Sequence, residues 1–283
     1  MRKWLAAVGT AVVLTSACSA DDQAPDAVAP PPAPSSSGGG TYLALGDSVP
    51  FGFRPDAGAA YSDAADFTGY PELVGDELGL QVRNAACPGE TTASFLDTTA
   101  QSNGCEDTLT SPVGYRTAFP LHVPYASAEQ SQLDLAVRTL RETDDVELVT
   151  LQIGANDVFV CRQTTPSRCT DPADTGALAA AVRANADTIL SALREEGGYD
   201  GQVVVVTYYA LDYATDTGGL GSGLAAVAAA HGADVADGYA AFRDPALAAG
   251  GSAEAAGLVF PGDVHPTPAG HRLLADAVLA VVD

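Results

Sequence analysis

Ser48 follows directly on a short apolar run, residues 42–45, and on two turn-forming residues, Gly46 and Asp47. An apolar run closed by a turn signal is typical of a buried strand. A serine at its end is held at the rim of the sheet, where a substrate can reach it, and can act as a nucleophile if a base removes its proton. A capping serine in an ordinary strand-to-loop turn has the same local sequence, so this motif alone does not identify an enzyme.

Three residues elsewhere in the chain could complete such chemistry. His265 is the candidate base, because imidazole titrates near neutral pH. The candidate donors to an oxyanion are the backbone N–H groups of Ser48 and Gly89 and the side-chain amide of Asn156. Glycine permits close backbone approach, and an amide donates hydrogen bonds without a charge that titrates. Together these residue types predict acyl transfer.

The elements that must position these residues alternate between strands and helices. Strands are predicted at 42–45, 80–84, 146–153, 203–209 and 235–236, and helices at 70–78, 127–142, 176–196, 223–230 and 267–282. This alternation predicts a three-layer α/β/α domain with a mainly parallel sheet. Ligands bind at the carboxyl ends of strands in such sheets. Ser48, Gly89 and Asn156 follow the first three strands, and His265 precedes the last helix, so we expect the four to meet at that edge.

The chain resembles the SGNH (GDSL) hydrolase superfamily in four sequence blocks, which occur in that family's order: GDS at 46–48, CPGETT at 87–92, GAND at 154–157 and DVHP at 263–266. The resemblance is to the secreted, disulfide-bonded esterase and lipase branch. It implies a flavodoxin-like fold and hydrolysis of carboxylic esters with neither a cofactor nor a metal. It assigns the nucleophile to Ser48, the oxyanion donors to Gly89 and Asn156, and the base to His265.

One block departs from the family pattern. Many members have an aspartate three residues before the histidine, where this chain has Gly262, while Asp263 lies two residues before. Two arrangements are open: Asp263 orients the Nδ1 atom of His265, or a backbone carbonyl near Gly262 does so and the site works as a Ser–His dyad. The disulfide-bonded branch includes enzymes that resemble the dyad, which favours the second arrangement.

The other histidines and several aromatic residues have alternative interpretations. His122 and His231 are rival bases, and His271 is interpreted as a packing or surface residue of the last helix. Asp47 is expected to hydrogen-bond its own turn and Asp157 to hold the turn that contains Asn156. Aromatic residues near strand ends either line an acyl pocket or belong to the core, the second being favoured: Phe51, Phe53, Phe159, Tyr208 and Tyr209.

The five cysteines are an odd number for an exported protein: Cys18, Cys87, Cys105, Cys161 and Cys169. Assigning Cys18 to a lipid leaves four, which can pair in three ways. Local pairing predicts Cys87–Cys105 and Cys161–Cys169, each closing a polar loop. A metal site is the rival interpretation, but neither pair has a nearby histidine or forms C-x-x-C.

The front of the chain is not globular. Residues 1–17 combine a basic start, an apolar run and small residues, which predicts a signal peptide. Residues 14–18 resemble the lipobox of bacterial lipoproteins, although Thr15 stands where that box usually has Leu, and this resemblance implies that Cys18 is acylated. Ordinary cleavage near Ala20 and free secretion is the alternative. Residues 18–40 are rich in Pro, Ser and Gly and predict a tether. The hydrolase domain is then expected at 41–283.

The chain carries 36 acidic against 13 basic residues, for a net charge of −23, which argues against a nucleic-acid partner. We therefore expect an exported enzyme that takes a small-molecule or lipid ester and contacts the membrane only through a lipid on Cys18. The alternatives are a glycan or cell-envelope deacetylase, a lysophospholipase, or a surface lipoprotein that binds glycan without catalysis. The sequence does not predict an oligomeric state.

Overall fold

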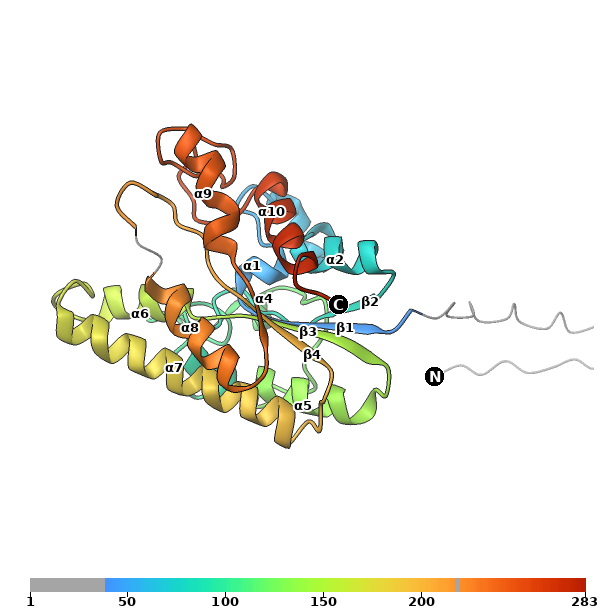
Figure 1. Ribbon diagram of the computed structural model, residues 1–283. Helices are drawn as coiled ribbons and strands as arrows, with labels where there is room; N and C mark the ends of the chain where they lie inside the picture. Colours follow the sequence, from blue (N-terminus) through green and yellow to red (C-terminus); the bar gives the residue numbers. More distant parts are fainter. Residues whose placement is uncertain (1–38, 217–218) are drawn as a thin grey trace, which may run out of the picture. The chain divides into compact units, whose positions relative to one another are not determined.

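A five-stranded sheet with all strands parallel forms the centre of the computed structural model, which describes residues 39–216 and 219–283 (Figure 1). The strand order is β2-β1-β3-β4-β5, the flavodoxin-like order of doubly wound sheets. The strands are β1 (Thr41–Gly46), β2 (Gln81–Asn84), β3 (Val146–Gln152), β4 (Gln202–Val206) and β5 (Asp234–Ala236). The predicted α/β architecture is confirmed. The predicted signal peptide, Cys18 and the linker up to residue 38 lie outside the described residues.

Helices cover both faces of the sheet, because successive side chains of each strand point to opposite faces (Figure 1). In β1, Leu43 and Leu45 pack against one helix layer, and Tyr42 and Ala44 against the other. The first layer contains α3 (Thr92–Leu96), α5 (Gln132–Glu142), α7 (Pro172–Glu195) and α8 (Gly219–Ala230). The second contains α2 (Tyr70–Leu78), α9 (Gly238–Ala248) and α10 (Pro268–Leu279). Each face of the sheet therefore has its own hydrophobic core, and a third, smaller cluster around Phe51 lies among the described loops.

The predicted start of α5 was wrong by five residues. The helix begins at Gln132, because Ser131 caps it: the Ser131 hydroxyl accepts from the Asp134 N–H, and the Asp134 carboxylate accepts from the Ser131 N–H. This reciprocal capping box satisfies two backbone donors that a helix end leaves free. Gln132 is thereby placed at the first helical position, next to the sheet.

Among the longer helices of the described residues, α6 (Ala155–Thr164) and α9 were not predicted. The helix α6 starts inside the block that was interpreted as a turn, and only Asn156 among its residues is buried. A helix with so little buried surface has no apolar stripe to reveal it. The helix α9 contains Pro245, which breaks the usual helix pattern.

The connections at the carboxyl edge hold short elements: α1 (Ser48–Phe51), α4 (Tyr115–Ala118) and two 3₁₀ turns, Gly58–Ser62 and Ala64–Asp66. Both predicted disulfides are present: Cys87–Cys105 across the loop after β2, and Cys161–Cys169 between α6 and the loop that follows it. None of the helices in the described part of the chain is both long and apolar enough to cross a bilayer.

Candidate active site

Ser48 is the first residue of α1, immediately beyond β1. The chain turns there through Gly46, which has φ +136° and whose Cβ, if it had one, would lie 1.9 Å from the Gln152 carbonyl oxygen. Only glycine fits this approach of β1 to the end of β3. The turn directs Ser48 Oγ to a point 2.9 Å from Nε2 of His265. The predicted nucleophile and base therefore share a hydrogen bond although they lie 217 residues apart in the chain.

His265 lies in the loop that precedes α10. The other ring nitrogen, Nδ1, lies 2.6 Å from Oδ1 of Asp263. The same oxygen accepts the backbone N–H groups of Val264 at 2.8 Å and His265 at 2.9 Å, which folds the carboxylate back onto the ring. Tyr209 holds this loop by donating to the Val264 carbonyl at 2.6 Å. The backbone-carbonyl arrangement that the resemblance favoured is thus not the one found in the structure.

The charges around His265 suit a base. Burial lowers the pKa of His265, and the Asp263 carboxylate opposes that shift. Desolvation would raise the pKa of Asp263, but its hydrogen bonds to the backbone and ring of His265 outweigh burial, so its pKa lies below the usual value. Near neutral pH the imidazole is therefore neutral and the carboxyl charged, with Nε2 free to accept the hydroxyl proton of Ser48.

Gly89 and Asn156 line the same pocket as Ser48 and His265. Gly89 has φ +87°, and a Cβ there would lie 2.5 Å from Cα of Gly104, so a larger residue cannot take its place. Asn156 is 5% exposed, and its Nδ2 atom donates to Oδ2 of Asp47 over 3.3 Å. The structure thus brings together all four residues that the sequence singled out.

Asp47 has a larger role in the structure than in the sequence prediction. Its Oδ1 atom accepts from the Val49 N–H at 3.0 Å, as expected for a turn, while Oδ2 accepts from the hydroxyl of Tyr208 and from Asn156. Burial raises the pKa of Asp47 to about 7, although these donors favour the charged form. The residue before the candidate nucleophile therefore binds the side chain of the candidate oxyanion donor.

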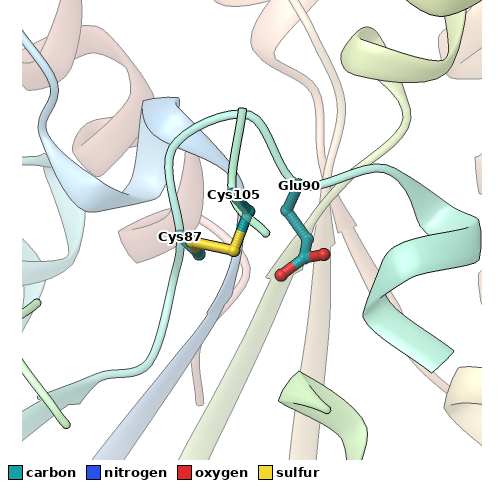
Figure 2. A group of neighbouring side chains, drawn as sticks. All are labelled: Cys87, Glu90 and Cys105. Carbon is teal, nitrogen blue, oxygen red and sulfur yellow. A yellow bond between two sulfur atoms is a disulfide. The ribbon is translucent and has the colours of Figure 1, made fainter. Parts of the chain in front are cut away.

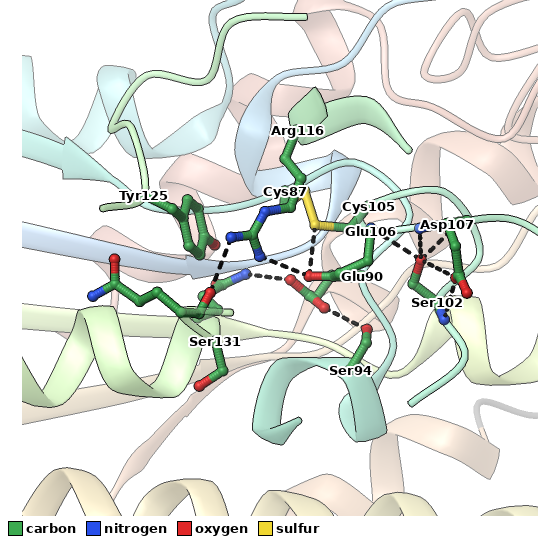
Figure 3. A network of polar contacts seen from close by, with 12 residues as sticks. Cys87, Glu90, Ser94, Ser102, Cys105, Glu106, Asp107, Arg116, Tyr125 and Ser131 are labelled. Atoms are coloured by element: carbon green, nitrogen blue, oxygen red, sulfur yellow. Dashed lines mark hydrogen bonds and ion pairs between the residues drawn. A yellow bond between two sulfur atoms is a disulfide. The ribbon is translucent and has the colours of Figure 1, made fainter. Parts of the chain in front are cut away.

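Gln132, at the start of α5, joins the nucleophile turn to a buried polar cluster, of which Figure 3 shows Glu90 and Ser94. The side-chain amide of Gln132 binds both polar atoms of the Gly46 backbone: Oε1 accepts from N–H at 2.6 Å and Nε2 donates to the carbonyl at 3.0 Å. Nε2 also donates to Glu90 at 3.1 Å, and Glu90 accepts from the Ser94 hydroxyl. Burial raises the pKa of Glu90 well above its usual value, and the nearby Glu106 adds to the shift. No sequence signal pointed to Gln132, because its partner is 86 residues away.

Within the described ranges, Cys87, Glu90 and Cys105 are the group whose ligand atoms lie close enough to hold a metal ion. Figure 2 shows, however, that the two sulfurs are bonded to each other beside the carboxylate. A disulfide has no thiolate to offer, so these residues do not fit a metal site.

The pocket around Ser48 has a volume of about 820 Å³. Phe53 lies beside the base, with 4.6 Å between the centres of the Phe53 and His265 rings. Of the five aromatic residues near strand ends, Phe51 belongs to the core, as favoured. The other four line the pocket: Phe53, Phe159, Tyr208 and Tyr209. Phe53, Tyr208 and Tyr209 also pack against the core, as favoured, whereas Phe159 does not belong to a core cluster of the described residues. Tyr209 also stacks on Phe242 of α9, with 4.4 Å between the ring centres, so one side chain serves both the core and the pocket.

The remaining histidines do not contact Ser48 in the structure. His122 binds the Phe51 carbonyl at 3.1 Å through Nε2, and His231 contacts Asp187 at 2.7 Å. His271 is buried in α10, and burial lowers its pKa to about 3. Asp157 accepts from the N–H and hydroxyl of Thr92, which ties α6 to α3 as expected for a residue that secures the turn.

The profile of the GDSL-like lipase/acylhydrolase family matches residues 44–273. The chain belongs to this family, and it is a carboxylic-ester hydrolase. The comparison with curated protein sequences returned no match.

Solved structures show the same fold at low sequence identity. An extracellular lipase from Streptomyces rimosus superposes with a TM-score of 0.54 at 19% identity, covering 87% of this chain and all of the lipase. Axe2, an acetylxylan esterase from Geobacillus stearothermophilus, gives 0.53 at 19% identity, with 86% and 93% covered. Phospholipase A1 from Streptomyces albidoflavus NA297 gives 0.51 at 23% identity, with 86% and 99% covered.

Proposed function

We propose that the chain is an exported serine esterase or lipase that hydrolyses carboxylic esters through an acyl-enzyme on Ser48. The observation that carries the proposal is the continuous hydrogen-bonded path from Ser48 Oγ to His265 Nε2 and from Nδ1 to Asp263, at the wall of an open pocket. Serine nucleophiles are activated by such an adjacent base, which a third group orients.

In the acylation step, Ser48 Oγ bonds to the ester carbonyl carbon while its proton passes to Nε2 of His265. The carbonyl oxygen becomes an oxyanion that faces the N–H groups of Ser48, Gly89 and Asn156. As the intermediate collapses, the C–O bond to the alcohol breaks and the alcohol leaves with the proton from Nε2. Water then repeats the sequence on the acyl-enzyme and releases the acid. The Asp263 carboxylate stabilises the imidazolium that forms in both steps.

The pocket lining supports an acyl group longer than acetyl. Apolar side chains line it beside the nucleophile, and an acetyl group would leave most of the volume of about 820 Å³ unfilled. The apolar part of the lining includes Phe53, Tyr115, Val158, Phe159 and Leu211. Burial of each methylene of an acyl chain contributes about 0.8 kcal/mol, so an ester with a longer chain binds more tightly until the pocket is filled. We therefore favour an esterase or lipase of this kind over a deacetylase.

Two disulfides in one domain support export, because cytosolic thiols are kept reduced. The lipid on Cys18 and the tether behind it are proposed from the sequence alone. Replacing Cys18 with Ser tests this: the wild-type protein should fractionate with membranes and the variant with the medium. Identical fractionation of both proteins would contradict the anchor.

A fluorophosphonate probe tests the catalytic proposal, because it bonds only to an activated serine. We expect wild-type protein to label, and Ser48→Ala and His265→Ala to remain unlabelled although they fold. Ser62→Ala serves as the matched control and should label like wild type. Labelling of Ser48→Ala, or no labelling of wild type, would contradict the proposal. Rates for p-nitrophenyl esters of increasing chain length, with acetylated xylan and a lysophospholipid alongside, then define the acyl preference.

A further inference from the structure

Asn103 contacts two of the three proposed oxyanion donors, Gly89 and Asn156. Its backbone N–H donates to the Gly89 carbonyl at 2.8 Å, and its side-chain Nδ2 donates to Oδ1 of Asn156 at 2.9 Å. Asn103 belongs to the loop between α3 and α4 and also lines the pocket. One residue therefore contacts both the segment that presents the Gly89 N–H and the side chain that presents the Asn156 amide.

The contact with Asn103 decides which way the Asn156 amide points. In the observed orientation Oδ1 accepts from Asn103 and Nδ2 donates to Asp47. Nδ2 carries two hydrogens, so one remains for a substrate oxygen. The reversed amide would set its NH₂ against the NH₂ of Asn103 and its oxygen against the Asp47 carboxyl. Asn156 is 5% exposed, so water cannot readily replace a lost partner.

Asn103 is itself held in place by its surroundings. The Asn103–Gly104 backbone packs directly on Gly89: a Cβ on Gly89 would lie 2.6 Å from the Gly104 nitrogen and 2.8 Å from the Asn103 carbonyl carbon. Cys105 joins the loop to Cys87, two residues before Gly89, through the disulfide. Gln163 of α6 donates to Oδ1 of Asn103 at 3.2 Å, which leaves the NH₂ of Asn103 directed at Asn156.

We propose that Asn103 is a positioning residue of the active site, which orients the Asn156 amide and links it to the Gly89 segment so that both donors face the same oxyanion. This inference rests on the proposed function, in which Gly89 and Asn156 bind that oxyanion. Asn103 acts only through these two donors and does not touch the reacting atoms. Its contribution should therefore appear in kcat and depend on the presence of the Asn156 amide.

A double-mutant cycle with Asn103→Ala and Asn156→Ala tests this dependence, with kcat and KM measured on a p-nitrophenyl ester. Loss of one oxyanion donor lowers kcat by about 10²–10³, which we expect for Asn156→Ala. We expect Asn103→Ala to lower kcat about tenfold with KM nearly unchanged, because the amide is then free to turn. In the Asn156→Ala background the same substitution should change kcat by less than about twofold.

Asn103→Asp gives a second test that preserves the size of the side chain. A carboxylate cannot donate to Oδ1 of Asn156, and it attracts the NH₂ group instead, which reverses the amide. We expect kcat to fall below that of Asn103→Ala. Gln101→Ala is the matched control: this amide lies in the same loop, donates to Ser102 and Asp107, and should leave kcat unchanged. Near-ultraviolet circular dichroism establishes that each variant is folded.

The possible outcomes separate this inference from the proposed function. The inference is overturned if Asn103→Ala keeps kcat within about twofold of wild type, or if its effect is equally large with and without the Asn156 amide. An Asn103→Asp variant as active as wild type would also overturn it. If instead Asn156→Ala leaves kcat unchanged while Ser48 still labels, the oxyanion role of Asn156 fails, and the inference fails with it.

Discussion

Replacing Asp263 with asparagine should lower kcat about tenfold. The reason lies in the oxygen that faces His265: Oδ1 of Asp263 also accepts the backbone N–H groups of Val264 and His265. An asparagine oxygen can keep both bonds, which holds the amide with its oxygen toward Nδ1. The ring then keeps its orientation and its tautomer, and only the negative charge is lost.

The expected magnitude follows from that loss of charge. A hydrogen bond to a charged group contributes about 1.5–3 kcal/mol and a neutral one about 0.5–1.5, so the imidazolium loses roughly 1.4 kcal/mol of stabilisation. This amount corresponds to about a tenfold change in rate. His265→Ala removes the base itself and should cost about 10²–10⁴. Asp263→Ala also removes the acceptor of two backbone N–H groups and should fall between these values.

The assay is hydrolysis of a p-nitrophenyl ester, with kcat/KM followed across pH. The Asp263 carboxylate raises the pKa of His265, so Asp263→Asn lowers that pKa and moves the acid limb of the profile to lower pH. Glu254→Gln is the matched control: Glu254 accepts from the Gly262 N–H at 3.1 Å in the same loop without contacting the ring. It should leave the profile in place.

Two results would refute this reasoning. Unchanged kcat and an unmoved acid limb in Asp263→Asn would mean that the enzyme works as a Ser–His dyad despite the contact at Nδ1. A loss as large as that of His265→Ala would mean that the amide turns its NH₂ to the ring and fixes the wrong tautomer.

Three further predictions concern neighbouring residues. Gly89→Ala should lower kcat by at least tenfold, because the new Cβ meets Gly104 at 2.5 Å; an unchanged kcat would contradict the close packing. His271→Leu should make the free energy of unfolding less dependent on pH below 6.5. Burial lowers the pKa of His271 to about 3 in the folded state, against about 6.5 in the unfolded state. The unfolding free energy of wild type therefore falls by up to about 1.4 kcal/mol for each pH unit below 6.5. Urea unfolding between pH 4 and 7 measures this, and parallel curves would contradict it. Tyr208→Phe removes the hydrogen bond from the Tyr208 hydroxyl to the Asp47 carboxyl. We expect a loss of about 2 kcal/mol in unfolding free energy at pH 8.5, where Asp47 is charged, and a smaller loss at pH 5, where its raised pKa keeps Asp47 neutral. Equal losses at the two pH values would contradict this prediction.

The strands and the main site residues could be predicted because their signals are local. Strands β1, β3 and β4 contain apolar runs and β2 alternates, and Ser48 and Asn156 lie within two residues of the glycines that end β1 and follow β3. The contacts that fix their orientation could not be predicted in this way. Asn103 lies in an irregular loop, 53 residues from Asn156 in the sequence. Gln132 contacts Gly46, which lies 86 residues earlier in the chain. Gln132 is the first residue of α5 only because Ser131 caps the helix, and that start was predicted five residues too early. Such pairings depend on the packed fold rather than on any periodic pattern.

The same difference between local sequence signals and contacts of the packed fold explains why the sequence did not decide whether Asp263 orients His265. The spacing of two residues from His265 departs from the family pattern and left open whether the carboxylate or a backbone carbonyl orients the ring. The backbone turn at Gly262, with φ +69°, and the two N–H groups that Oδ1 accepts bring it there. A turn of this kind depends on left-handed backbone geometry, which a glycine permits but does not specify.

The position of the Cys87–Cys105 disulfide implies that the active site forms fully only after this bond has formed. The bond closes the segment that carries Gly89 and Asn103, so a newly synthesised chain with free thiols would have this segment untethered. In the exported enzyme that we propose, the site would therefore form only after the polypeptide reaches an oxidising environment.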